Sequence, residues 1–218
     1  MLVVAALVLP AMAAPINGTY NVDGNWNEAF NGWDPLPRPG DVGNNVFYAG
    51  GSGWFAYGTL ASVELLGSYE NTLVYKSVYA GDPVYSNVNL NYGGSWSPEN
   101  LVNYQASIDE ITVITTKTYN GTPLQDDSNL KGLSFIASGS GWVTTSSPKG
   151  ESEITPITNV AVSFTATSTE MPTFGYWEPG ILMDMSGNFD SVQITIVPEP
   201  ATMSLLAIGA VGMLRRKK

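Results

Sequence analysis

Apolar and polar side chains alternate with a period of two along much of the chain. In the run 160–166, Val160, Val162 and Phe164 share one side and small or hydroxyl residues share the other. Successive side chains of a β-strand point to opposite faces, so such runs predict strands with one solvent-exposed face. Further strands are predicted at 45–48, 54–57, 62–66, 72–79, 84–92, 108–116, 133–137, 142–145, 181–185 and 191–197. Between residues 14 and 197 no apolar pattern of helical period persists.

Clusters of glycine, asparagine and proline separate these runs, and we interpret 50–53 and 138–141 as hairpin turns. About eleven short strands with such turn signals predict an all-β body over residues 14–197. The expected fold is an antiparallel β-sandwich or jelly roll, with a secreted β-helix as the alternative. One short helix is expected around 98–105, because Ser97 resembles an N-cap followed by proline at the first helical position.

The first thirteen residues form an apolar segment that closes on Ala11-Met12-Ala13. An apolar stretch of this length ending in a small-x-small pattern predicts a secretory signal peptide, cleaved after Ala13. The body is therefore expected to be exported.

Residues 198–218 have three parts: Pro198-Glu199-Pro200, an apolar run over 201–214, and the basic residues Arg215, Arg216, Lys217 and Lys218. As a helix, 201–214 would rise about 21 Å, short of the hydrocarbon core of about 30 Å. We therefore expect a short transmembrane helix. Positive residues stay on the cytoplasmic side, so the basic run acts as a cytoplasmic stop and the body lies outside.

This three-part end resembles the PEP-CTERM sorting signal of bacterial exosortase substrates. The resemblance covers about the last 22 residues and is carried by Val197-Pro198-Glu199-Pro200, Thr202, the Leu205-Leu206 pair and the basic close. It implies that the protein is held briefly in the membrane and processed near Pro198-Glu199-Pro200 by an exosortase. It also implies a final place at the cell surface or outside the cell, in association with exopolysaccharide or extracellular matrix.

The composition removes several kinds of chemistry. The chain has no cysteine and no histidine, so thiolate nucleophiles, histidine bases and the usual zinc sites are excluded. Before Pro198 it carries five basic and eighteen acidic side chains, a net charge of −13. Such a body cannot neutralise the phosphate groups of a nucleic-acid backbone, so nucleic acid is excluded as a partner.

Glycoside hydrolysis needs two carboxyl groups that face one sugar. Asp109 and Glu110 are adjacent in a predicted strand and are expected on opposite faces, whereas Asp126-Asp127 and the pair Glu151 and Glu153 lie in predicted loops. We therefore predict a non-catalytic protein without a cofactor. A glycoside hydrolase or lyase with dispersed carboxylates is an alternative.

Calcium is the metal that this composition allows, because it takes oxygen ligands alone. The candidate ligands are Asp126 and Asp127 in one loop, and Asp184, Asn188 and Asp190 around Gly187. Neither group matches an EF-hand loop, and ordinary Asx turns are the favoured explanation of both.

Six tryptophans and eleven tyrosines suggest a second alternative, a carbohydrate-binding module, because flat exposed rings stack on sugar rings. Four tryptophans lie in or beside turns rich in glycine or proline and are the candidate sugar-binding residues: Trp33, Trp54, Trp96 and Trp177. The competing interpretation places these rings in the core of the sheet.

Overall fold

The computed structural model describes residues 18–30, 45–51, 53–80, 88–93, 102–124, 128–148, 154–157, 160–178 and 181–198. Within these ranges every element is a β-strand and every strand pair is antiparallel. In chain order the strands are β1 (Gly18–Val22), β2 (Asn25–Phe30), β3 (Asn45–Gly51), β4 (Trp54–Tyr69), β5 (Thr72–Ala80), β6 (Val88–Gly93), β7 (Val102–Tyr119), β8 (Leu130–Pro148), β9 (Thr155–Pro156), β10 (Val160–Ser168), β11 (Thr173–Glu178), β12 (Ile181–Asn188) and β13 (Ser191–Pro198).

Hydrogen bonds join these strands into one sheet with the order β1-β13-β10-β8-β7-β5-β4-β3-β2-β12-β11, while β6 pairs with β7 and β9 with β8. The prediction of an all-β antiparallel body is confirmed. The two separate sheets of a sandwich or jelly roll are not found in the described residues, because the sheet is continuous. The antiparallel pairing also differs from the parallel coils of a β-helix.

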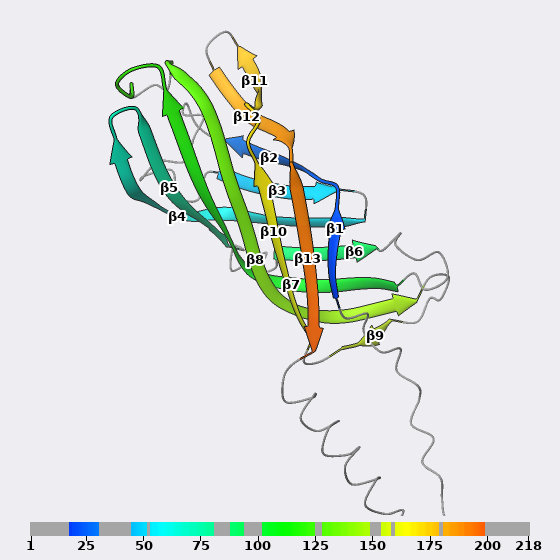
Figure 1. Cartoon of the computed structure of the whole chain (residues 1–218). Coiled ribbons are helices and arrows are strands. Elements are labelled where there is room, and N and C mark those ends of the chain that lie inside the picture. The colour runs from blue at the N-terminus through cyan, green and yellow to red at the C-terminus, as the bar shows by residue number, and fades with distance from the viewer. Residues whose placement is uncertain are drawn as a thin grey trace, which may run out of the picture.

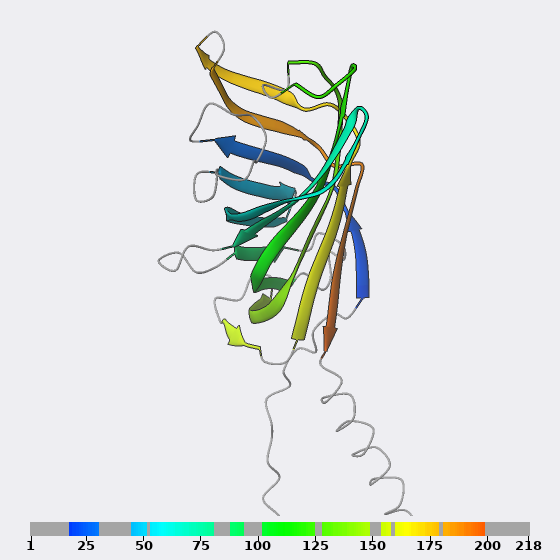
Figure 2. The ribbon, with the colours of Figure 1, turned by 90° about the vertical axis from the view of Figure 1, so that its left-hand side faces the viewer.

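The single sheet folds over on itself. In Figure 1 the strands β8, β10 and β13 run along the length of the molecule in front, and β2, β3 and the start of β4 cross behind them. Figure 2 shows the two parts from the side, stacked as layers. The long strands β7 and β8 bend and contribute to both layers, which is how one sheet covers its own apolar face.

A bulge at Asp109 marks the bend of β7. Strand β7 pairs with β6 up to Ile108 and with β5 from Glu110 onward, and its register with β8 shifts between these two residues. An extra residue of this kind bends a strand and increases its twist. Ile108 and Ile111 are both buried, whereas Asp109 and Glu110 are both exposed. The bulge therefore keeps the inner face apolar on both sides of the bend.

Two glycines of β8 lie opposite this bulge. Gly141 pairs with Ile108 and Gly139 with Ile111. A Cβ on Gly141 would lie 1.9 Å from the carbonyl oxygen of Ser107, and one on Gly139 would lie 2.5 Å from a ring carbon of Phe164. The prediction of a hairpin turn at 138–141 is wrong, because these residues lie inside β8, where the missing side chains make room for the backbone of Ser107 and the ring of Phe164.

Two other local predictions have different outcomes. The turn at 50–53 is confirmed, because it joins β3 to β4 between Gly51 and Trp54. The helix expected at 98–105 is wrong for its second half: residues 102–105 are the start of β7, paired with β8. Residues 98–101 lie outside the described residues.

The core fills the space between the two layers. As predicted, Val160, Val162 and Phe164 of β10 point inward. The last strand follows the same pattern, with Val192, Ile194 and Ile196 buried in the core and Gln193 and Val197 exposed. The rings of Trp26, Phe47, Trp54, Tyr79, Phe135 and Phe164 supply much of the buried volume.

A buried hydrogen bond links β5 to β2 within this core. The hydroxyl of Tyr79, on β5, donates to Oε1 of Glu28, on β2, at 2.5 Å, and both residues are buried. Burial raises the pKa of Tyr79 well above its ordinary value, and the nearby Glu28 carboxyl raises it further. Tyr79 therefore keeps its proton in the folded protein at pH values where an exposed tyrosine loses it.

Replacing Gly141 with alanine should destabilise the fold by about 2–3 kcal/mol, because the new Cβ would collide with the backbone of Ser107. Urea denaturation measures the loss. Gly132→Ala, in the same strand, is the matched control, because the nearest atom to its Cβ would be 3.8 Å away. Its effect should stay below about 1 kcal/mol. Equal losses in the two variants would show that β8 is not closely packed at the bend.

Stability should fall as pH rises above about 10, because the unfolded chain releases the Tyr79 proton there and the folded chain retains it. This group contributes a slope on the order of 1 kcal/mol per pH unit. Tyr79→Phe should show a shallower fall in urea denaturation between pH 9 and 11. Tyr69→Phe, at a ring that is 68% exposed, should keep the wild-type slope. Identical slopes for wild type and Tyr79→Phe would contradict the assignment.

Candidate functional site

The residues at the end of β13 lead directly into the three-part C-terminal segment. Strand β13 ends at Pro198, which pairs with Val160 of β10, and Val197 is exposed beside it. The strand lies inside the sheet, between β1 and β10. Ala13, Glu199, Pro200, the apolar run 201–214 and the basic residues Arg215, Arg216, Lys217 and Lys218 lie outside the described residues. Among the described residues, no helix is long and apolar enough to cross a membrane.

The four candidate tryptophans have different outcomes. Trp54 is buried in the core, where its indole nitrogen donates to the carbonyl oxygen of Asp23 at 2.9 Å, so its ring is closed to a sugar. The glycine turn beside Trp54 predicts an exposed ring, but this turn lies at the edge of the core. Trp177 lies in β11, and its side chain is not described. Trp33 and Trp96 lie outside the described residues.

The candidate calcium ligands do not converge where they are described. Asp184 and Asn188 lie four residues apart on β12, and the rise of an extended strand separates them by about 13 Å. Asp190 accepts a hydrogen bond from the Thr169 hydroxyl at 2.8 Å. The described residues contain no group of three or more acidic side chains that could hold a metal. Asp126 and Asp127 lie outside the described residues.

A shallow groove lies on the outer face of β7, β8, β10 and β13, and we call it the outer groove. It consists of two adjoining depressions, each of about 280 Å³, that share Ser140 and Ser163. Asp109 and Trp142 line the first depression and Glu110 lines the second. The small outward-facing side chains of Ser138, Ser140, Ala161 and Ser163 leave this face hollow.

The register of the strands aligns hydroxyl groups across the groove. Ser140 on β8 pairs with Ser163 on β10, and Ser163 pairs with Thr195 on β13. The row continues to Thr19 on β1, whose hydroxyl lies 3.0 Å from that of Thr195. Neighbouring strands lie about 4.8 Å apart, so the row presents closely spaced groups that can both donate and accept hydrogen bonds, and the hydroxyls of Thr19 and Thr195 bond to each other.

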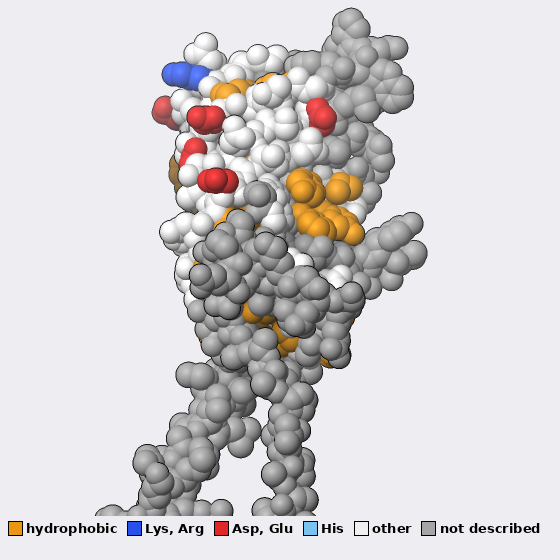
Figure 3. Space-filling model, turned by 90° about the vertical axis from the view of Figure 1, so that its right-hand side faces the viewer, with side chains coloured by type: hydrophobic (Ala, Val, Ile, Leu, Met, Phe, Trp, Pro, Cys, Tyr) orange, Lys and Arg blue, Asp and Glu red, His pale blue; other side chains and the backbone are white. Residues whose placement is uncertain are grey.

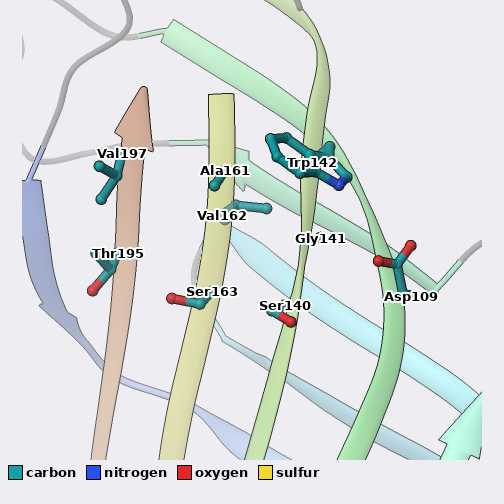
Figure 4. Close-up of a pocket in the computed structure, with 9 residues that line it drawn as sticks. All are labelled: Asp109, Ser140, Gly141, Trp142, Ala161, Val162, Ser163, Thr195 and Val197. Atoms are coloured by element: carbon teal, nitrogen blue, oxygen red, sulfur yellow. The ribbon is translucent and has the colours of Figure 1, made fainter. Parts of the chain in front are cut away.

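Trp142 stands at one end of this row. It is 42% exposed and pairs with the small Ala161, and Figure 4 shows its ring on β8 beside Asp109 of β7. Trp142 was not among the sugar-binding candidates predicted from the sequence. Alternation in the predicted strand 142–145 places Trp142 and Val143 on opposite faces, but only the structure shows that Val143 is the one that points inward.

The prediction for the adjacent carboxylates is wrong, and the bulge in β7 is the reason. Asp109 and Glu110 were expected on opposite faces of a regular strand. The extra residue breaks the alternation, and both side chains are exposed at the outer groove. Acidic side chains also outnumber basic ones on the side of the molecule shown in Figure 3.

A second exposed group consists of three rings on β3 and β4, which we call the aromatic row. The ring centroids of Tyr48 and Phe55 lie 6.4 Å apart with planes at 12°, and those of Phe55 and Tyr57 lie 6.3 Å apart with planes at 15°. Tyr48 and Tyr57 are 38% and 36% exposed. Each ring is partly covered by its neighbour in the row.

Comparison with known proteins assigns the C-terminal segment. Residues 197–218 match the PEP-CTERM protein-sorting motif. No curated protein and no solved structure matches the chain. The match confirms the resemblance carried by Pro198-Glu199-Pro200 and the basic close. The chain therefore ends in a PEP-CTERM sorting signal, the motif that exosortases recognise, and is targeted as an exported protein.

Proposed function

We propose that this is a non-catalytic surface or matrix protein whose β-body is delivered outside the cell and associates there with extracellular polysaccharide. A signal peptide ending at Ala13 starts export. The short apolar run 201–214 then holds the chain in the membrane, with Arg215–Lys218 on the cytoplasmic side. An exosortase releases the body by cutting near Pro198-Glu199-Pro200.

The observation that carries this proposal is the direct passage from β13 into the sorting motif. The matched motif begins at Val197, inside β13, so no linker separates the body from the signal. Strand β13 is hydrogen-bonded on both sides, to β1 and β10. The body is therefore held close to the membrane until it is cut, and the cut leaves the last strand in place.

The outer groove favours carbohydrate binding over glycoside hydrolysis as the activity of the body. A hydrolase needs one carboxyl that keeps its proton beside the scissile bond and a second that acts as base or nucleophile. Asp109 and Glu110 lie exposed on an open face, where water solvates both carboxylates. An open groove with one exposed tryptophan and a row of hydroxyl groups suits binding better than bond cleavage.

Mass spectrometry of the mature protein from an exosortase-competent host tests the processing. The expected C-terminus lies before residue 201, because cleavage near the motif removes the apolar run and the basic stop. A triple substitution, Pro198→Ala, Glu199→Ala and Pro200→Ala, should leave the chain full-length in the membrane fraction.

Glu170→Ala is the matched control, because Glu170 is an exposed glutamate of the body, far from the motif in the sequence, and its replacement should leave processing unchanged. A host without exosortase should accumulate the full-length chain. A wild-type C-terminus at Lys218 in the competent host would contradict the proposal.

A further inference from the structure

We propose that the outer groove is a binding site for an uncharged polysaccharide, with Trp142 as the surface on which a sugar ring stacks. This inference rests on the proposed association with extracellular polysaccharide and names the site and the class of glycan.

The first support is the exposure of Trp142. A tryptophan in a sheet usually buries most of its ring in the core, as Trp26 and Trp54 do here at 2% exposure each. Trp142 is 42% exposed, and its cross-strand neighbour Ala161 is too small to cover an indole. The apolar face of a sugar ring can stack on such an indole, because the ring is rigid and loses little entropy on binding.

The second support is the polar row next to the indole. Ser140 and Ser163 lie in register, and the first depression extends from Asp109 and Trp142 across them to Thr195 (Figure 4). Sugars present hydroxyl groups around an apolar ring face. The groove matches both parts, since the indole lies at one end and hydroxyl and carboxylate oxygens line the rest.

The charge around the groove selects the class of glycan. Asp109 lines the first depression and Glu110 the second, and among the described residues no lysine or arginine lines either of them. Uronic or sulfated polysaccharides would bring negative charge against these carboxylates and against the acidic body. Uncharged polysaccharides avoid this repulsion, and their hydroxyl groups can donate to both carboxylates.

Affinity electrophoresis of the full chain in detergent tests the site. The gels contain one of four uncharged polysaccharides, a glucan, a mannan, a galactan or a xylan, or alginate as the anionic probe. At least one uncharged polysaccharide should retard the wild type, and alginate should not. Trp142→Ala should weaken the retardation at least tenfold, and Trp142→Phe should keep part of it because a flat ring remains.

Tyr57→Ala is the control for the loss of an exposed aromatic ring elsewhere, and it should bind as the wild type does. Asp109→Asn should weaken binding to the uncharged polysaccharide less than Trp142→Ala does, because the amide oxygen still accepts hydrogen bonds, and it should reduce the discrimination against alginate. Thermal unfolding of each variant verifies that it is folded, and Trp142→Phe gives the answer if Trp142→Ala does not fold.

Several outcomes would overturn the proposal. Retardation by none of the uncharged polysaccharides, preference for alginate, or full binding by the tryptophan variants would each do so. Loss of binding in Tyr57→Ala alone would move the site to the aromatic row. Processing is measured separately by mass spectrometry. A negative result for glycan binding in the groove therefore does not contradict exosortase-dependent export, and a negative result for processing does not contradict glycan binding.

Discussion

The structure depends on one constraint: a single continuous sheet must bury its own apolar face. Two packed sheets would each cover the other, but here the hydrogen-bonded order runs unbroken from β1 to β11. The long strands β7 and β8 must therefore bend, and the bend has to avoid both a buried charge and a void. The bulge at Asp109 and the glycines at 139 and 141 meet these requirements together.

The same bend produces the surface chemistry. By inserting one residue, the bulge turns both Asp109 and Glu110 outward, and the inward-facing Gly139 and Gly141 leave room for the close packing beneath the bend. Trp142 follows the second glycine and lies at the edge of the outer groove. The outer groove is therefore a by-product of how the sheet closes, and changes that straighten the bend would also alter the groove.

Strand content was predictable because alternation is a local property: alternate residues point inward as their spacing requires, in β10 Val160, Val162 and Phe164 and in β13 Val192, Ile194 and Ile196. The role of the glycines could not be predicted in the same way. The same residue type marks a turn at 50–53 and a closely packed position at 139 and 141, and only the opposite strand distinguishes the two. Trp54 and Trp142 both follow glycines, yet one is buried and the other exposed, because burial depends on the strands that lie across from them. The sorting signal could be identified without tertiary structure, because its three parts are contiguous in the sequence.

The position of β13 has a consequence for the order of folding. The last strand of the body is inserted between β1, the first strand, and β10, so Gly18 and Ile196 are partners although almost the whole body separates them in sequence. Contacts of such long range form late and slowly, since the intervening chain must first be brought together. On the proposed export route the chain crosses the membrane from its N-terminus, so β13 emerges last, immediately before the segment proposed to hold the chain in the membrane. Until β13 is in place, an unfinished body on that route has an unpaired β10 edge open to aggregation.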